Sequence, residues 1–207
     1  MLTLYAKKNA GSVAVEAMLA ACGTDYEIKD VQRDAAGALP ASLFAVNPRG
    51  EVPTLVLPDG TIMTESAAIL IHLADIFPQV KLAPALTSPL RPRYLRWMLF
   101  LATTIYMSDL RLYYPERYTA DAAGASGIKA KAAAGMEKEF EILSDAVGDG
   151  PFILGAGMSA ADIYAAMLAT WAPDVAALFK KHPNIKTLHD RVAAVPAIAK
   201  VWARNGM

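Results

Sequence analysis

The chain has a single cysteine, Cys22, among its 207 residues, and this scarcity excludes an internal disulfide framework. It also has no surplus of charge, because 20 Lys and Arg residues balance 20 Asp and Glu residues. Nucleic-acid binding needs a basic surplus or patch, and the short pair Lys7-Lys8 supplies neither. We therefore expect a protein of a reducing compartment that does not have nucleic acid as its partner.

Targeting signals and long apolar runs are lacking as well. The amino terminus does not have the charged-then-apolar order of a signal peptide. The most apolar stretch, around residues 97–107, is too short to cross a bilayer. These absences predict a cytoplasmic protein with no membrane partner.

Motifs for metals and nucleoside phosphates are also missing. His182 and His189 do not have the spacing of a zinc motif, so no metal site is expected. The glycines Gly155 and Gly157 are not followed by the lysine of a phosphate-binding loop.

What the chain does have is apolar sequence in short, punctuated segments. Hydrophobic residues make up 55% of it and charged residues 19%, which allows a substantial core. In the first 79 residues the pattern predicts strands and helices in alternation, over residues 2–5 (strand), 12–22 (helix), 26–31 (strand), 40–46 (helix), 54–57 and 61–63 (hairpin) and 65–77 (helix). This β-α-β-α-β-β-α order is the thioredoxin-like pattern, and its first half predicts parallel strands joined by a crossover helix.

The remainder of the chain reads as helical. Residues 80–89 carry two prolines and a serine and are interpreted as a linker, and no convincing strand follows. Helices are expected over residues 90–118, 128–147, 159–171, 174–179, 184–195 and 197–203. The predicted domains are therefore 1–79, α/β, and 90–207, all-helical. Ser159 and Asp162 have the spacing of a capping box, to which we assign a folding role.

The most informative stretch is the segment from Asn47 to Leu55, followed by a Thr-Glu-Ser sequence at residues 64–66. A short strand follows Val52-Pro53, and Glu65-Ser66 opens an apolar helix. A strand edge thus lies beside a helix N-terminus. Such an edge can pair with the backbone of a small peptide while the helix end takes its carboxylate.

This arrangement resembles the glutathione site of the cytosolic glutathione transferases, and the resemblance extends over essentially the whole chain. It implies that the bond between Val52 and Pro53 is cis, that Val52 hydrogen-bonds the cysteinyl backbone of glutathione, and that Glu65 and Ser66 bind its γ-glutamyl end. The bacterial beta class is the nearest, but Gly11 stands where that class has its active-site cysteine. A mixed disulfide with glutathione at that position is therefore excluded.

Glutathione chemistry needs a thiolate, and a free thiol has a pKa of about 8.5. Lowering it by two units requires roughly 2.7 kcal/mol. A helix N-terminus supplies about 0.3–2 kcal/mol and a hydrogen bond to the anion about 1.5–3 kcal/mol. The donor should thus stand at the start of the first helix, where Ser12, Asn9 and Tyr5 are the candidates in that order. For each there is a simpler role: a helix cap for Ser12, a turn for Asn9 and packing for Tyr5.

The second substrate is expected against the first helix of the helical half. A stripe at near-helical spacing gives the candidate pocket residues Tyr106, Met107, Leu110 and Tyr113, although such a stripe also suits a core. Beta-class relatives carry an Asn and a His on this helix. Aligned on Trp97, those positions hold Leu99 and Tyr106.

The resemblance implies a homodimeric detoxification enzyme that joins reduced glutathione, as co-substrate, to an apolar small-molecule electrophile by thiolate attack. The alternative is a transferase-like module that binds or assembles without turnover. A third hypothesis, glutathione-dependent isomerisation as in the zeta class, is disfavoured because its two serines and cysteine read Asn9, Ala10 and Gly11 here.

Overall fold

The computed structural model describes residues 1–207, which form two compact units. The first joins Met1–Ala83 to Ala193–Met207, and the second is Pro84–Val192. No helix is both long enough and apolar enough to cross a membrane. The expected α/β half and helical half are both present.

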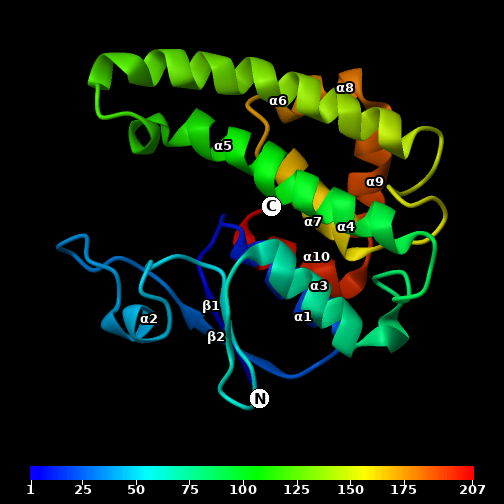
Figure 1. Ribbon diagram of the computed structural model, residues 1–207, viewed down its shortest axis with the longest axis horizontal. Helices are drawn as coiled ribbons and strands as arrows, with labels where there is room; N and C mark the ends of the chain where they lie inside the picture. Colours follow the sequence, from blue (N-terminus) through cyan, green and yellow to red (C-terminus); the bar gives the residue numbers. More distant parts are fainter. The chain divides into compact units, whose positions relative to one another are not determined.

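A four-stranded sheet forms the centre of the first unit, in the spatial order β2-β1-β3-β4. Figure 1 labels two of its strands, β1 and β2. Its strands are β1 (Leu2–Ala6), β2 (Tyr26–Asp30), β3 (Thr54–Val56) and β4 (Ile62–Met63). β1 runs parallel to β2 and antiparallel to β3, and β3 is antiparallel to β4. The thioredoxin-like element order expected from the sequence is confirmed.

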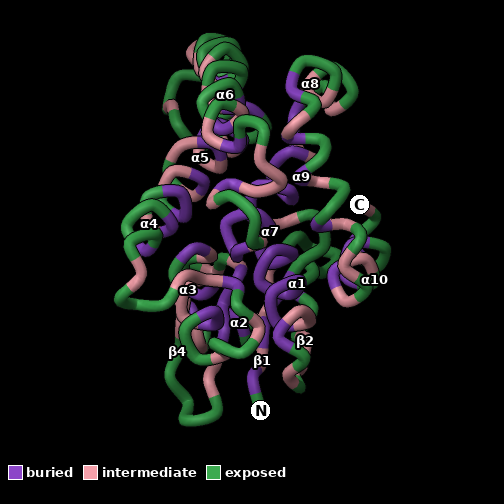
Figure 2. Tube along the Cα trace, turned by 90° about the vertical axis from the view of Figure 1, so that its right-hand side faces the viewer, coloured by how far each residue is buried: buried purple, intermediate pink, exposed green.

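The helices of the first unit are α1 (Ser12–Cys22), α2 (Ala41–Val46), α3 (Ser66–Ile76), the short η1 (Pro78–Val80) and α10 (Pro196–Asn205). α1 is buried along almost its whole length, as Figure 2 shows, because α3 and α10 both pack against it. Gly23 ends α1 in the left-handed conformation, with φ 65°, that glycine adopts without strain.

The position of α10 differs from the expected division of the chain. Residues 90–207 were expected to form one helical domain, but Ala193–Met207 belongs to the unit built on the sheet. The physical reason is the apolar face of α10, on which Ile198, Val201 and Trp202 are buried. That face packs against α1.

The second unit is helical, and an isolated bridge between Phe152 and Gly155 is its nearest approach to a strand. Its elements are α4 (Arg91–Phe100), η2 (Leu101–Ile105), α5 (Tyr106–Tyr113), η3 (Pro115–Tyr118), η4 (Ala122–Gly124), α6 (Ala125–Val147), α7 (Ala160–Ala169), α8 (Val175–Lys181) and α9 (Pro183–Ala193). The single long helix expected over 90–118 is α4 and α5 joined by η2, which is a π-helical turn.

The predicted capping box at the start of α7 is confirmed. One carboxylate oxygen of Asp162 accepts hydrogen bonds from the backbone N–H of Ser159 (2.7 Å) and from its hydroxyl (2.8 Å). The other accepts the backbone N–H of Ile153 at 2.8 Å. α7 is buried along its entire length, so this box fixes the entry of the central helix of the unit.

Candidate functional site

Three segments of the first unit lie at the same end of the sheet because of the way its strands are paired. Tyr5 of β1 is paired with Thr54 of β3, and Leu55 with Met63 of β4. The recorded pairing stops there, and residues 52–53, residues 65–66 and the turn after β1 adjoin these last pairs along the chain. The turn that follows β1, the start of β3 and the start of α3 therefore lie at the same end of the sheet.

The bond between Val52 and Pro53 is cis, as expected from the resemblance. Val52 is half-buried and precedes β3, so its main chain lies just beyond the paired part of the sheet. Pro53 is buried. An extended peptide laid along Val52 would continue the sheet at this point.

Two buried polar residues that the sequence analysis did not single out hold this loop in shape. The side-chain amide of Asn47 donates to the carbonyl oxygen of Glu51 (2.9 Å) and to the hydroxyl of Thr54 (3.1 Å). Its carbonyl oxygen accepts the backbone N–H of Arg49 at 3.1 Å. Thr54 in turn donates to the carbonyl oxygen of Glu51 at 2.9 Å. An Asn before a Pro indicates a turn, but only the fold reveals its burial.

Glu65 and Ser66 stand at the N-terminus of α3. Glu65 is exposed and has a φ of 63°, an uncommon conformation for a residue other than glycine. Such outliers concentrate at ligand-binding positions. Ser66 is half-buried and begins the helix, whose first turn carries no acidic side chain to neutralise its positive end.

The three candidate thiolate donors lie in the turn between β1 and α1 or directly beside it, and they differ in burial and in hydrogen bonding. Ser12 is fully buried, and its hydroxyl donates to the carbonyl oxygen of Lys7 and accepts the Lys7 N–H, both at 3.0 Å. Asn9 is exposed, with a φ of 51°. Tyr5 is half-buried on β1. No side chain caps α1 and no acidic residue lies in its first turn, so its positive end faces the turn unopposed.

The residues expected to contact the electrophile lie on α5 in the second unit. The ring of Tyr106 packs edge-on against Trp171, with centroids 5.6 Å apart, and lies tilted against Tyr164 at 6.3 Å. The hydroxyl of Tyr113 donates to the carbonyl oxygen of Trp171 at 2.8 Å. Met107 and Leu110 are half-buried on the same helix. Trp171 thus links the two tyrosines that stand seven residues apart.

Cys22 takes no part in this arrangement. It is buried at the far end of α1, and desolvation raises its pKa to about 11, so the thiol stays protonated. No group of three or more His, Cys, Asp or Glu side chains that suits a metal ion is present.

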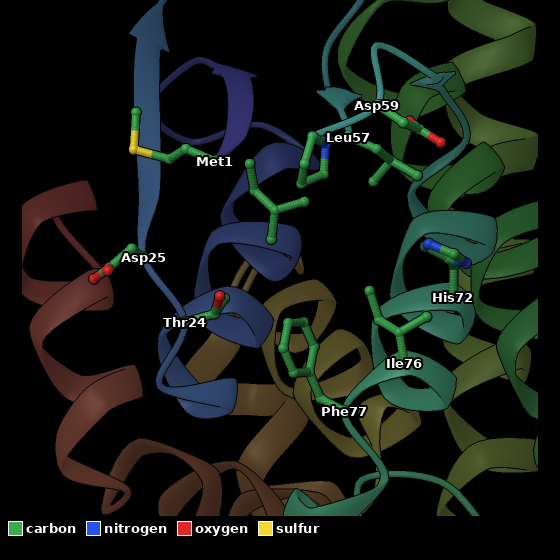
Figure 3. A pocket seen from close by; sticks show the side chains of 10 residues that line it. Met1, Thr24, Asp25, Leu57, Asp59, His72, Ile76 and Phe77 are labelled. Carbon is green, nitrogen blue, oxygen red and sulfur yellow. The ribbon is translucent and has the colours of Figure 1, made fainter.

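A cavity of about 620 Å³ opens at the opposite end of the sheet (Figure 3). Leu57, Ile76 and Phe77 supply apolar walls, and Asp25 and Asp59 lie at its margin. It adjoins the C-terminal end of α1, whose eleven residues separate it from the 7–12 turn by about 16 Å. None of the predicted site residues lines it, so this cavity is distinct from the candidate site.

A buried charge cluster behind the 7–12 turn was also missed by the sequence analysis. Glu16 of α1 is almost fully buried and forms an ion pair with Arg204 of α10. The amide of Asn205 donates to the other oxygen of Glu16 at 3.1 Å. Lys7, Lys8 and these residues line a smaller hollow of about 210 Å³. The cluster fastens α10 to α1 one turn beyond Ser12.

Comparison with known proteins gives the family of the chain. The family models described as the glutathione S-transferase N-terminal and C-terminal domains match residues 12–76 and 110–204, which together make up most of the chain. The chain is 28% identical over 210 residues to glutathione S-transferase GstA of Escherichia coli O157:H7, with both proteins covered completely.

Two solved structures extend the likeness to three dimensions. A glutathione transferase homologue from Sulfitobacter with bound glutathione has a TM-score of 0.90 and 27% identity, covering 100% of this chain and 99% of the other. A sphingomonad glutathione S-transferase complexed with glutathione has a TM-score of 0.83 and 28% identity, with 99% of both chains covered.

Proposed function

Because the chain belongs to the glutathione S-transferase family, of the bacterial cytosolic type, we propose that it joins reduced glutathione to an apolar electrophile by thiolate attack. The observation that carries this proposal is that Val52, Glu65 and the 7–12 turn adjoin the last paired residues at one end of the sheet. A peptide backbone, an α-carboxylate and a thiolate then each have a matching group within one site.

In this site Val52 pairs with the cysteinyl backbone of glutathione, with Pro53 fixing the path of the loop. The γ-glutamyl end docks at Glu65 and Ser66, where the helix N-terminus favours its carboxylate and the Glu65 carboxylate favours its ammonium group. Two of the similar solved structures contain bound glutathione, which supports the same ligand here.

The thiolate lies at the N-terminus of α1. Ser12, the first candidate from the sequence, would have to leave both of its bonds to Lys7 before it could donate to sulfur. Asn9 is exposed on the same turn and Tyr5 is half-buried on the strand before it, and neither needs such a change. We therefore propose that Asn9 or Tyr5 donates to sulfur and that Ser12 holds the turn.

Substitution at the helix N-terminus tests glutathione binding. Ser66→Ala should weaken binding, measured by titration calorimetry, by about tenfold through loss of one hydrogen bond to a charged group. Asp59→Ala, in the exposed turn of the hairpin, is the matched control and should bind like the parent. Parent protein that evolves no heat with millimolar glutathione would refute the proposal.

The thiol pKa of bound glutathione, read from thiolate absorbance, tests the donors. Loss of the true donor should raise it by about one to two units. Asn9→Ala, Tyr5→Phe and Ser12→Ala are compared, with Lys8→Ala as the control on the same turn. If only Ser12→Ala raises the pKa, our assignment of Ser12 to structure is wrong.

A non-catalytic binding module is the second candidate, and one observation favours it. The positions where beta-class relatives carry an Asn and a His hold Leu99 on α4 and Tyr106 on α5. Leu99 is 55% exposed, and the ring of Tyr106 packs on Trp171. A pKa near 8.5 for bound glutathione, with no turnover of any electrophile, would decide for the module.

In either case we propose a cytoplasmic homodimer, and light scattering of the purified protein would test the dimer.

A further inference from the structure

The cavity at the far end of the sheet from the candidate glutathione site has no part in the proposed function. Its volume of about 620 Å³ lies within the range of small-molecule sites. All the residues that line it belong to the first unit, so its shape does not depend on the second unit. It is therefore a second place in the first unit where a small molecule can be held.

Apolar side chains form most of the cavity wall. Leu2, at the start of β1, is almost fully buried. Leu57 follows β3, Ile76 and Phe77 come from the end of α3, and Figure 3 shows these three side chains around the cavity. Ile76 is 45% exposed, so part of this apolar wall is open to water. A ligand with an apolar body would cover it.

Two carboxylates stand on opposite sides of this wall, those of Asp25 before β2 and Asp59 in the turn between β3 and β4 (Figure 3). The backbone N–H of Thr61 donates to Oδ1 of Asp59 at 2.9 Å and holds the pKa of that carboxyl below its usual value. No Lys or Arg side chain lines the cavity. With His72 neutral at pH 7, the amino group of Met1 is the one cation of the lining, so the two carboxylates leave a negative charge.

Two helices also bring their negative ends to this cavity. α1 begins at Ser12 and α3 at Ser66, both at the candidate glutathione site. α1 ends two residues before Thr24, and α3 ends at Ile76, so the C-terminal carbonyl groups of both helices reach the cavity. Neither helix has a basic side chain in its last turn. The helix dipoles therefore favour an anion at the glutathione end of the unit and a cation at the cavity end.

We propose that this cavity binds a hydrophobic amine in its protonated form, with the apolar body against Leu57, Ile76 and Phe77 and the ammonium group at the margin where Asp25 and Asp59 lie. An ammonium group has only donors to offer, and carboxylates have only acceptors. An anion of the same shape would be repelled by the charge of the lining. This binding is independent of the proposed function, because none of these residues belongs to the candidate glutathione site.

Three ligands with the same apolar body test the role of charge. At pH 7, 4-phenylbutylamine is a cation, 4-phenylbutanol is neutral and 4-phenylbutanoate is an anion. Titrations followed by NMR of the backbone amides should give the amine a Kd below about 1 mM, the affinity of a small ligand of ordinary efficiency. The alcohol should bind roughly fivefold more weakly, and the anion more weakly still. Equal affinities for the amine and the alcohol would overturn the proposal.

The amide signals that shift identify where the amine binds. They should belong to residues 24–25, 57–61 and 72–77, whereas the signals of residues 7–12 and 52 should not move. Glutathione at about 10 mM should not displace the amine, because the two ligands occupy opposite ends of the unit. Displacement by glutathione, or shifts confined to the 7–12 turn, would show that the amine occupies the glutathione site and would overturn the proposal.

Removing both carboxylates tests their part directly. Asp25→Asn combined with Asp59→Asn keeps the side-chain shape and an acceptor for the N–H of Thr61. It should weaken the amine about tenfold and leave the alcohol within about twofold. Asp30→Asn combined with Asp34→Asn is the control, because it removes the same charge from exposed positions of the same unit that do not line the cavity. Equal losses in both double variants would show a general effect of charge and would overturn the proposal.

The apolar wall is tested at its exposed side. Ile76→Ala should weaken the amine and the alcohol alike, by about threefold, because both ligands cover this side chain. Ile62→Ala is the control, since Ile62 on β4 is 46% exposed and does not line the cavity. If Ile76→Ala leaves both affinities unchanged, the ligand does not lie in this cavity and the proposal is wrong.

Discussion

Asp162 and Asp109 are both buried on helices of the same unit, but their surroundings are opposite. Asp162 is fully buried and accepts hydrogen bonds from Ile153 and from both the N–H and the hydroxyl of Ser159. Asp109 is 6% exposed and has an unpartnered Oδ1. Desolvation raises the pKa of both, to about 6 for Asp162, where these hydrogen bonds oppose it, and to about 7 for Asp109.

The difference separates two uses of a buried acid. A carboxylate whose lone pairs are filled by the chain itself stabilises the backbone around it and is not available to a ligand. One that keeps an oxygen without a donor weakens the fold instead. Glu16 is intermediate between Asp162 and Asp109, because its partners are the side chains of Arg204 and Asn205 and not the backbone.

The largest effect is expected from removing the satisfied acid. Asp162→Ala leaves one hydroxyl and two backbone N–H groups without an acceptor, so the free energy of unfolding should fall by about 4 kcal/mol. Urea unfolding followed by circular dichroism measures it. Asp174→Ala is the control, because Asp174 caps α8 at an exposed position and should cost only about 1 kcal/mol. Equal losses would contradict the distinction.

A smaller effect is expected at the intermediate acid. Arg204→Ala leaves the buried Glu16 carboxylate with Asn205 alone, and should lower the free energy of unfolding by about 2 kcal/mol. Adding Glu16→Leu in the same chain should recover part of this loss, because no unpaired charge then remains. Lys181→Ala, which breaks an exposed pair with Glu137, should produce no measurable change. A double variant less stable than Arg204→Ala would contradict this reading.

The smallest effect is a change in the pH dependence of stability. The raised pKa of Asp109 means that the folded state binds more protons than the unfolded state between about pH 4 and 7. Stability from this group therefore falls as pH rises through that range. From pH 6 to pH 8, the ionisation of this group lowers the free energy of unfolding by about 1.4 kcal/mol.

Asp109→Asn should abolish this loss of stability. The difference between the urea midpoint of the variant and that of the parent should therefore be larger at pH 8 than at pH 6. Asp162 and the other titrating groups act equally in both chains and cancel in the difference. A difference between the two chains that does not vary with pH would show that Asp109 is already ionised, or already satisfied, in the folded protein.

The sequence predicted the local elements well and the long-range polar contacts poorly. The bounds of α1 agree because Gly23 stops the helix, and the hairpin agrees because Pro58 to Gly60 is a strong turn signal. α10 was assigned to the helical half because an amphipathic pattern shows that a face is buried but not what covers it.

The polar side chains escaped prediction for a related reason. Ser12 turns its hydroxyl back to Lys7, a local bond that competes with any role toward a ligand and cannot be ranked from spacing. Asn47, Glu16 and Asp109 look like ordinary surface residues in the sequence. Only the packing of distant segments reveals that all three are buried.

The packing of α10 on α1 has a consequence for folding during synthesis on the ribosome. The ribosome adds about 5–20 residues each second, so the stretch Pro84–Val192 takes roughly 5–20 s to emerge after the sheet strands have left the tunnel. During that interval α1 lacks its cover, and the apolar residues that α10 will bury remain open to water and to chaperones. The nascent chain therefore completes its first-made unit last.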